Sequence, residues 1–232
     1  MLAANRADPR LSAVEGIVFD LDGTLLALGA APGAGLASWL GRLPGVSRPD
    51  ELARRAWVLT ETPVNYAMVL LTRARLEPRL RAWIDWGRHL KGVARHEELA
   101  AIDGVVDAVA TLAQRYALAV VTNRGRRDAV GFLERTGLST HVRVVVTRDD
   151  VWRLKPHPAP LRKAASALDL PVERTLLCGD MPVDMRAARR GGALAVGVAS
   201  GFCTEPELRR AGADWVLASV RELPGLLGAC VI

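Results

Sequence analysis

Two carboxylates stand near the start of the chain with one residue between them, directly after a short apolar run. Asp20 and Asp22 follow residues 17–19, whose continuous apolar character predicts a buried strand, and Gly23 then turns the chain. Two acids at the mouth of a buried strand repel each other and lose solvation unless a cation or a substrate stabilises them. The pair therefore indicates a site that binds a cation or a reacting group.

Other polar side chains follow later apolar runs in the same way. Thr122 and Asn123 come after residues 117–121, and Lys155 lies in the loop beyond residues 142–146. Asp180 follows residues 175–178, and Asp184 comes four residues later. A hydroxyl, an ammonium and several acids thus stand where strands are expected to end.

These runs predict a parallel sheet. Further strand-like runs occur at residues 194–198 and 215–217, and helical patterns separate the later runs at residues 126–135, 158–168 and 183–190. Apolar strands that alternate with helices are typical of a parallel sheet covered on both faces. Ligands bind such sheets beyond the carboxyl ends of the strands, so one cleft is expected to gather the polar groups.

One region breaks the alternation. Residues 28–102 contain no convincing strand, and their periodicity predicts helices at residues 35–43, 49–60, 64–74 and 78–90. We therefore expect an α/β fold with a Rossmann-like, three-layer parallel sheet and an inserted all-helical cap. The expected core comprises residues 1–27 and 103–232, and the expected cap comprises residues 28–102.

The four groups of polar residues occur in an order that resembles the haloacid dehalogenase superfamily of aspartate-nucleophile phosphatases. The matching motifs are DxDGT at residues 20–24, the hydroxyl of Thr122, the amine of Lys155 and GDxxxD at residues 179–184. Because a helical insertion follows the first motif, the chain is most similar to the phosphoglycolate-phosphatase-like members. The resemblance covers nearly the whole chain.

The resemblance implies a hydrolytic mechanism through an aspartyl-phosphate. Asp20 would attack phosphorus, and Asp22 would protonate the leaving group and later deprotonate water. Thr122, Asn123 and Lys155 would bind the phosphate. The implied reaction is the hydrolysis of a small phosphorylated metabolite.

The resemblance also implies Mg²⁺ as cofactor, because this ion prefers hard oxygen ligands. The implied ligands are the Asp20 and Asp180 carboxylates and the Asp22 backbone carbonyl. Asp184 would stand behind them and orient metal-bound water.

The insertion is the expected source of substrate specificity. The polar segment 60–66 looks like a loop between two helices, and candidate substrate contacts in and near it are Arg54, Arg55, Thr62, Asn65 and Tyr66. The tryptophans of this region, Trp39, Trp57, Trp83 and Trp86, are better explained as the core of a helical bundle.

Some polar residues near the motifs are expected to have no catalytic role. Arg124, Arg126 and Arg127 follow Thr122 and are interpreted as a solvated first helical turn. His157 is interpreted as an ordinary loop residue.

The composition limits the classes of partner. The formal net charge of +6 and the pI of about 9.9 favour anionic partners, either phosphorylated metabolites or nucleic acid. The arginines are spread along the chain and form no basic stripe, so no nucleic-acid partner is expected. Cys178, Cys203 and Cys230 lack metal-type spacing and fit a reducing compartment. With no signal peptide or membrane span in the pattern, we expect a cytoplasmic protein.

Other functions remain open. A sugar phosphomutase of the β-phosphoglucomutase type would use the same residues, provided that it protects its aspartyl-phosphate from water. A dehalogenase is less consistent with the sequence because Asp22 has no role in displacing a halide. A non-enzymatic, basic nucleic-acid-binding protein is the remote alternative. The sequence leaves the oligomeric state and the identity of the substrate undetermined.

Overall fold

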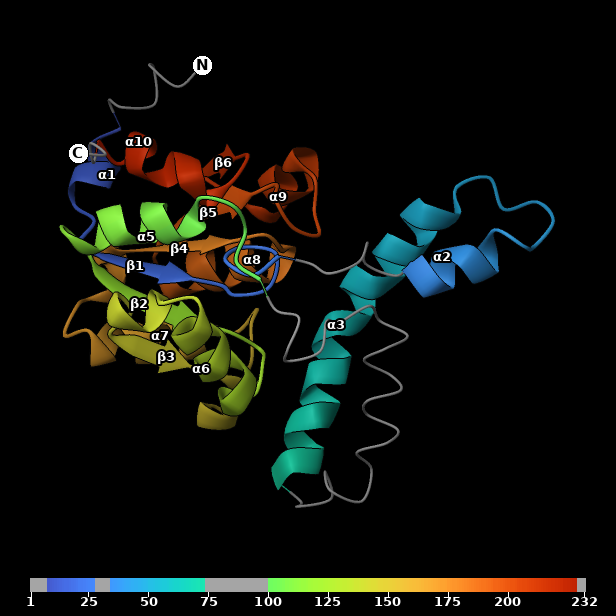
Figure 1. The fold of residues 1–232 in the computed structure, drawn as a ribbon, viewed down its shortest axis with the longest axis horizontal. Helices are drawn as coiled ribbons and strands as arrows, with labels where there is room; N and C mark the ends of the chain where they lie inside the picture. The colour runs from blue at the N-terminus through green and yellow to red at the C-terminus, as the bar shows by residue number, and fades with distance from the viewer. Residues whose placement is uncertain (1–7, 28–33, 74–99, 229–232) are drawn as a thin grey trace. The chain divides into compact units, whose positions relative to one another are not determined.

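The computed structural model describes residues 8–27, 34–73 and 100–228 (Figure 1). The chain divides into two compact units. The first unit joins Met1–Ala27 to Ala100–Ile232, and the second unit is Leu28–Leu99.

A six-stranded parallel sheet forms the centre of the first unit, in the order β3-β2-β1-β4-β5-β6. The strands are β1 Gly16–Phe19, β2 Ala117–Val121, β3 Val144–Val146, β4 Thr175–Gly179, β5 Leu194–Val198 and β6 Trp215–Leu217. Every residue of β1 and β4 is buried, as expected for central strands covered on both faces. The predicted parallel, Rossmann-like sheet is confirmed.

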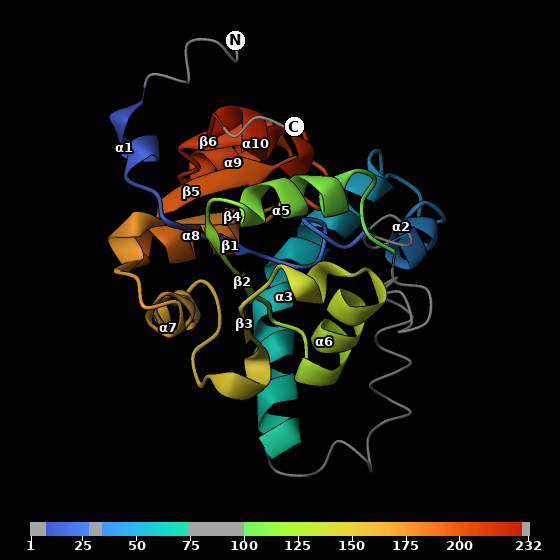
Figure 2. The ribbon, with the colours of Figure 1, turned by 60° about the vertical axis from the view of Figure 1, so that its left-hand side comes forward.

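Helices cover both faces of this sheet (Figure 2). On one face α7 packs on β1, β2 and β3, α8 packs on β4 and β5, and α9 packs on β5 and β6. On the other face α5 packs on β2 and on α10, and α6 packs on β3. A short helix, α1, precedes β1. The bounds are α1 Pro9–Ser12, α5 Val105–Ala113, α6 Arg126–Arg135, α7 Ala159–Ala167, α8 Pro182–Gly191, α9 Glu205–Ala211 and α10 Leu223–Leu226.

The second unit corrects one prediction. Instead of two helices separated by a loop at residues 60–66, a single helix, α3, spans Pro49–Arg73 with Pro63 inside it. A proline removes one backbone donor from a helix and costs about 3 kcal/mol. Here that penalty is not enough to end a helix whose neighbouring turns continue on both sides.

The other described helix of the second unit is α2, Ala34–Leu40, which packs against α3. It ends three residues before the predicted limit, at Leu40 rather than residue 43. Ala37 on α2 and Ala53 on α3 are buried, so small side chains allow close packing here. The predicted helix 78–90, with Trp83 and Trp86, lies outside the described residues.

The two segments that connect the core to the insertion pair with each other. The Ala27 N–H donates to the Ala100 carbonyl at 2.8 Å, and the Ile102 N–H donates to the Leu25 carbonyl at 3.0 Å. Leu26 and Ala101 form an antiparallel bridge between these bonds. Residues 100–102 therefore belong with the core unit, whereas the expected boundary was residue 103.

Within the described ranges, none of the helices combines the length and the apolar character that a membrane span requires.

Candidate active site

The register of the sheet brings the motif residues together. The Cα atom of Phe19 is paired with Val120 on β2 and with Cys178 on β4. One residue further, Asp20 leaves β1 and its N–H donates to the Cys178 carbonyl at 2.8 Å. Thr122 and Asp180 each follow the last residue of a neighbouring strand, so all three stand at the carboxyl edge of the sheet.

Lys155 lies at the centre of the acids. It reaches them from the loop between β3 and α7, and it is only 2% exposed. Its Nζ donates to Asp20 Oδ1 at 2.5 Å and to the Val121 carbonyl at 3.1 Å, and lies 2.6 Å from Asp184 Oδ1. One buried cation thus partly neutralises carboxylates from two different motifs.

Asp180 is held in place without a cation of its own. Its Oδ2 accepts the Phe202 N–H at 2.7 Å, while its Oδ1 is buried and has no hydrogen-bond partner in the part of the chain that the structure describes. A Cβ atom on Gly23 or on Gly201 would collide with Oδ2, so these glycines let two loops close around the carboxylate. A buried carboxylate oxygen without a partner is costly unless a cation binds it.

Three carboxylates meet here at ligand-like distances. One oxygen each from Asp20, Asp180 and Asp184 lies within 4.8 Å of the others, and all three residues are buried. Buried acids so close together repel each other strongly, and oxygen ligands of this kind suit a hard divalent cation. The donor set therefore fits the implied metal, and the orphaned Asp180 Oδ1 is the observation that supports it.

The electrostatics of the cluster follow from burial. Burial raises the pKa of Asp20 to about 7 despite the opposing charge of Lys155. Burial, together with the charges of Asp20 and Asp184, also raises the pKa of Asp180 well above its ordinary value. For Lys155, burial acts in the opposite direction, but the carboxylates of Asp184 and Asp20 outweigh it and raise its pKa. Additional positive charge at this edge would favour ionised acids.

Asp184 also holds the turn that follows β4. Its Oδ2 accepts the Met181 N–H at 3.1 Å and thereby caps α8. The residue is completely buried, and its other oxygen is the one that faces Lys155. Asp184 thus contributes an oxygen to the acidic cluster, and its role in orienting metal-bound water stays a prediction.

Thr122 lies in a loop that hydrogen bonds hold in place. The Thr122 backbone N–H donates to the Val146 carbonyl at 2.9 Å, and the Thr122 Oγ1 accepts the N–H of Arg124 at 3.1 Å. Because Oγ1 is the acceptor in that bond, the hydroxyl hydrogen remains available as a donor. Asn123 follows in the same loop and is half-buried.

Arg124 corrects a second prediction. It precedes α6, its side chain is only 10% exposed, and its Nε donates to Asp22 Oδ1 at 2.8 Å and to Oδ2 at 2.7 Å. Nη2 donates to Asp22 Oδ1 at 2.5 Å. Burial would lower the pKa of Arg124, but Asp22 outweighs it and raises that pKa. The only signal in the sequence was an arginine two residues beyond a strand-end threonine.

The neighbouring basic residues, Arg126, Arg127 and His157, fit the prediction that they lie in solvated or ordinary loop positions. Arg126 begins α6, is exposed, and binds Asp150 at 2.7 Å. Arg127 is exposed in the same turn. His157 makes contacts within its own loop, because its Nδ1 accepts the Ala159 N–H at 3.1 Å.

The candidate contacts on the insertion lie on α3. Arg55 is exposed and forms a 2.5 Å ion pair with Glu51, and Arg54 and Tyr66 are half-buried. The backbones of Thr62 and Asn65 belong to the same helix, and their side chains lie outside the described structure.

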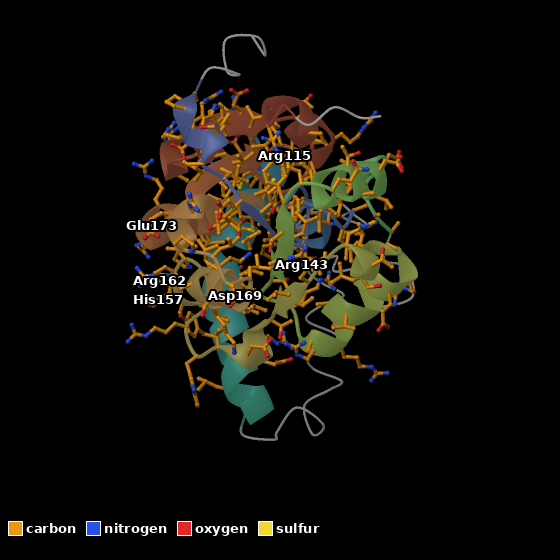
Figure 3. All side chains as sticks on the ribbon, turned by 90° about the vertical axis from the view of Figure 1, so that its left-hand side faces the viewer. Arg115, Arg143, His157, Arg162, Asp169 and Glu173 are labelled. Carbon is orange, nitrogen blue, oxygen red and sulfur yellow. The ribbon has the colours of Figure 1, made fainter. Side chains whose placement is uncertain are left out.

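The opposite edge of the sheet has a different character. Arg115, Arg143 and Glu173 come just before β2, β3 and β4, and all three are exposed (Figure 3). A shallow hollow nearby is lined in part by Arg162 and Asp169, which are also exposed. Exposed charges of both signs are ordinary solvated surface, so we assign no site to this edge.

Comparison with known proteins agrees with this geometry. A family model described as haloacid dehalogenase-like hydrolase matches residues 17–198, which include all four motifs. The chain belongs to the haloacid dehalogenase-like hydrolase family. The prediction of the family from its motifs, and with it the prediction of an enzyme, is confirmed.

Individual relatives within the family match this chain over alignments of different length. A plasmid-encoded phosphoglycolate phosphatase of Cupriavidus necator is 40% identical over 114 residues, which is 49% of each chain. A phosphoglycolate phosphatase of Pectobacterium atrosepticum is 29% identical over 236 residues, which covers 94% of each chain. The structure of a hydrolase from Pseudomonas syringae superposes with a TM-score of 0.66 at 26% identity, covering 90% of this chain and 95% of the other. The first match spans about half the length of its relative.

Proposed function

We propose that this chain is a Mg²⁺-dependent phosphatase that hydrolyses a small phosphorylated metabolite through an aspartyl-phosphate. One observation carries the proposal: Asp20, Asp180 and Asp184 are buried together around Lys155, and Asp180 Oδ1 has no partner among the described residues. The names of the relatives support phosphate esters as the substrates.

The metal would be held by the Asp20 and Asp180 carboxylates and by the Asp22 backbone carbonyl. Asp184, which already contacts Lys155, would complete the acidic environment. Bound Mg²⁺ supplies positive charge that neutralises phosphoryl oxygens in the transition state. The remaining chemistry belongs to the chain's own side chains.

Asp20 is the proposed nucleophile. Its carboxylate oxygen would bond to phosphorus while the bond from phosphorus to the ester oxygen breaks, and Asp22 would give its proton to the departing oxygen. Water would then attack the aspartyl-phosphate, with Asp22 accepting a proton from that water, and inorganic phosphate would leave as the bond to Asp20 breaks. The Lys155 ammonium, 2.5 Å from Asp20, fixes the orientation of the nucleophile.

The phosphate is proposed to bind next to Thr122, Asn123 and Lys155. Since Thr122 Oγ1 accepts a bond from the Arg124 N–H, its hydroxyl hydrogen can be donated to a phosphoryl oxygen. A donor held in advance by the loop needs no reorganisation during the reaction, which is the basis of electrostatic stabilisation.

The insertion is proposed to act as a cap that selects the leaving group. Its candidate contacts are Arg54, Arg55, Thr62, Asn65 and Tyr66, all on α3. Two of these candidates, Arg54 and Arg55, are cationic, which suits an anionic substrate. We also propose a cytoplasmic location, which the buried thiol of Cys178, outside any disulfide among the described residues, supports.

The test is a screen of phosphorylated metabolites for release of inorganic phosphate, with Mg²⁺ and with a chelator. The proposal expects release from at least one small monoester, loss of release in the chelator, and no release by Asp20→Asn. Turnover that appears only as isomerisation of a sugar phosphate would replace it with the phosphomutase. Salt-sensitive DNA binding without any turnover would support the non-enzymatic alternative.

A further inference from the structure

The imidazole of His157 lies between two hydrogen-bond donors. Its Nδ1 accepts the Ala159 N–H at 3.1 Å, and its Nε2 lies 3.1 Å from Nη1 of Arg153. A neutral imidazole carries one proton, so one ring nitrogen donates and the other accepts, whereas a guanidinium can only donate. In either tautomer, therefore, one of the two contacts places a donor against a donor.

The local structure assigns the ring proton to Nε2. Ala159 is the first residue of α7, where a backbone N–H has no partner within the helix. Its bond to Nδ1 of His157 satisfies that donor, whereas the exposed Arg153 guanidinium has solvent as an alternative partner. With Nδ1 as the acceptor, Nε2 carries the hydrogen and points at Arg153. Two donors thus converge at a place that lacks an acceptor.

Two further guanidinium groups surround this pair. Arg190 Nη1 donates to the Pro156 carbonyl at 3.2 Å, next to His157, and Arg162 Nη2 donates to the Arg190 carbonyl at 3.3 Å. Figure 3 shows His157 and Arg162 at the surface of the core unit. Burial and the charges of the three arginines lower the pKa of His157 from 6.5, so the ring is neutral at neutral pH. We call this group the cationic cluster: Arg153, His157, Arg162 and Arg190.

The charges of the cationic cluster are all of one sign. Among the described residues, its arginines contact an imidazole and backbone carbonyls but form no ion pair with a carboxylate. Asp169 and Glu173 lie in the segment that follows α7, and neither pairs with these arginines. Positive charge without a counter-charge attracts anions, and the amino edge of the sheet differs in that it carries both signs.

We propose that the cationic cluster binds a phosphate dianion, either free or as the terminal group of a small molecule, outside the active site. Phosphate oxygens accept from the Nε2–H of His157 and from the Arg153 guanidinium, which replaces the contact between two donors with two charge-assisted bonds. The other two arginines add positive charge. The same loop carries Lys155, whose side chain is buried among the acids, so the ligand would bind to the outside of the segment that supplies this cation. The inference goes beyond the proposed function and does not depend on it.

The experiment follows the imidazole nitrogens by long-range ¹H–¹⁵N NMR at about pH 7.5, where a histidine is neutral. A chelator is present throughout, and comparison with His157→Gln assigns the signals. Inorganic phosphate is titrated into the wild type, with sodium chloride at equal ionic strength as the reference. The inference expects a proton on Nε2 and a saturable shift of that signal with phosphate but not with chloride.

Two variants locate the site. Arg153→Gln should raise the phosphate concentration at half-saturation by about 5- to 10-fold, because one charge-assisted bond is lost. The matched control is Arg127→Gln, which removes an exposed charge on α6 and should leave half-saturation unchanged. A parallel titration with methyl phosphate identifies the source. Similar affinity means that a terminal phosphate is accepted, and weaker binding means that the site selects free phosphate; both results support the inference.

Three results would overturn the inference. A proton on Nδ1 would mean that Nε2 accepts from Arg153 and that no acceptor is missing. A shift that sodium chloride reproduces would reflect screening and not a phosphate site. An unchanged half-saturation in Arg153→Gln would show that phosphate acts from elsewhere, the active site included. Since the chelator excludes Mg²⁺-dependent turnover, each result holds whether or not the protein proves to be a phosphatase.

Discussion

The two edges of the central sheet carry comparable kinds of charged residue, but these residues are buried at one edge and exposed at the other. At the carboxyl edge, Asp20, Lys155, Asp180 and Asp184 are between 0% and 7% exposed. At the amino edge, Arg115, Arg143 and Glu173 are solvated (Figure 3). Burying charge costs free energy that solvated charge does not incur. The difference shows where the fold gives up stability, and this is where the proposed chemistry lies.

The largest expected effect is on turnover at the buried edge. Asp20→Asn removes the proposed nucleophile and should lower kcat by about 10⁴-fold or more, because loss of a nucleophile removes the covalent route. Phosphate release measures the effect, and circular dichroism checks that the variant folds. Hydrolysis at the wild-type rate by a folded variant would rule out Asp20 as the nucleophile.

The next largest effect is on stability at the same edge. Lys155→Met leaves the neighbouring acids without their buried cation and should cost about 3 kcal/mol of unfolding free energy. The matched control is Lys163→Met on the exposed side of α7, where the expected cost is below about 1 kcal/mol. Urea unfolding with a chelator present measures both. Equal costs would mean that Lys155 does not hold the cluster together.

The pH dependence of stability sharpens the comparison further. Because burial raises the pKa of Asp20 from 3.8 to about 7, and raises that of Asp180 too, the folded protein keeps protons that the unfolded chain has released. Stability without metal should therefore fall as the pH rises from 3.8 to about 7, by on the order of 4 kcal/mol from Asp20 alone.

Urea unfolding across this pH range, in chelator, tests that slope. Asp180→Asn removes one of the two groups and should flatten the curve. Mg²⁺ should flatten it for the wild type, since the cation favours the ionised acids. Parallel curves for wild type and variant would contradict the assignment of the slope to this cluster.

The smallest effects are expected at the amino edge. Arg143→Gln and Glu173→Gln remove solvated charges and should change the unfolding free energy by less than about 0.5 kcal/mol, with phosphate release within about twofold of wild type. A loss of more than about 1 kcal/mol at either position would show that this edge, too, depends on its charges.

The sheet was predictable because the relevant signals are local. The apolar runs at residues 117–121, 194–198 and 215–217 became β2, β5 and β6 with the same bounds. The continuity of α3 through Pro63 was not predictable from the sequence. A proline only biases the local backbone, and the residues on either side of it decide whether the helix continues.

The same distinction applies to the site. Asp20 and Asp180 each directly follow a recognisable strand, so their meeting at one edge follows from the parallel order. The partnership of Arg124 with Asp22 joins residues 102 positions apart. No local pattern encodes such a pair, and a position just before a helix favours solvation as the default interpretation.

The pairing of residues 25–27 with residues 100–102 has a consequence for the insertions that the core can accept in evolution. The backbone leaves the sheet and returns to it at hydrogen-bonded neighbours, so the core closes on itself whatever lies between them. The entropy of closing a flexible connection grows slowly, by about 0.6 kcal/mol for each doubling of length. Insertions of different size and sequence can therefore be exchanged by recombination at this junction, while the catalytic edge is inherited intact.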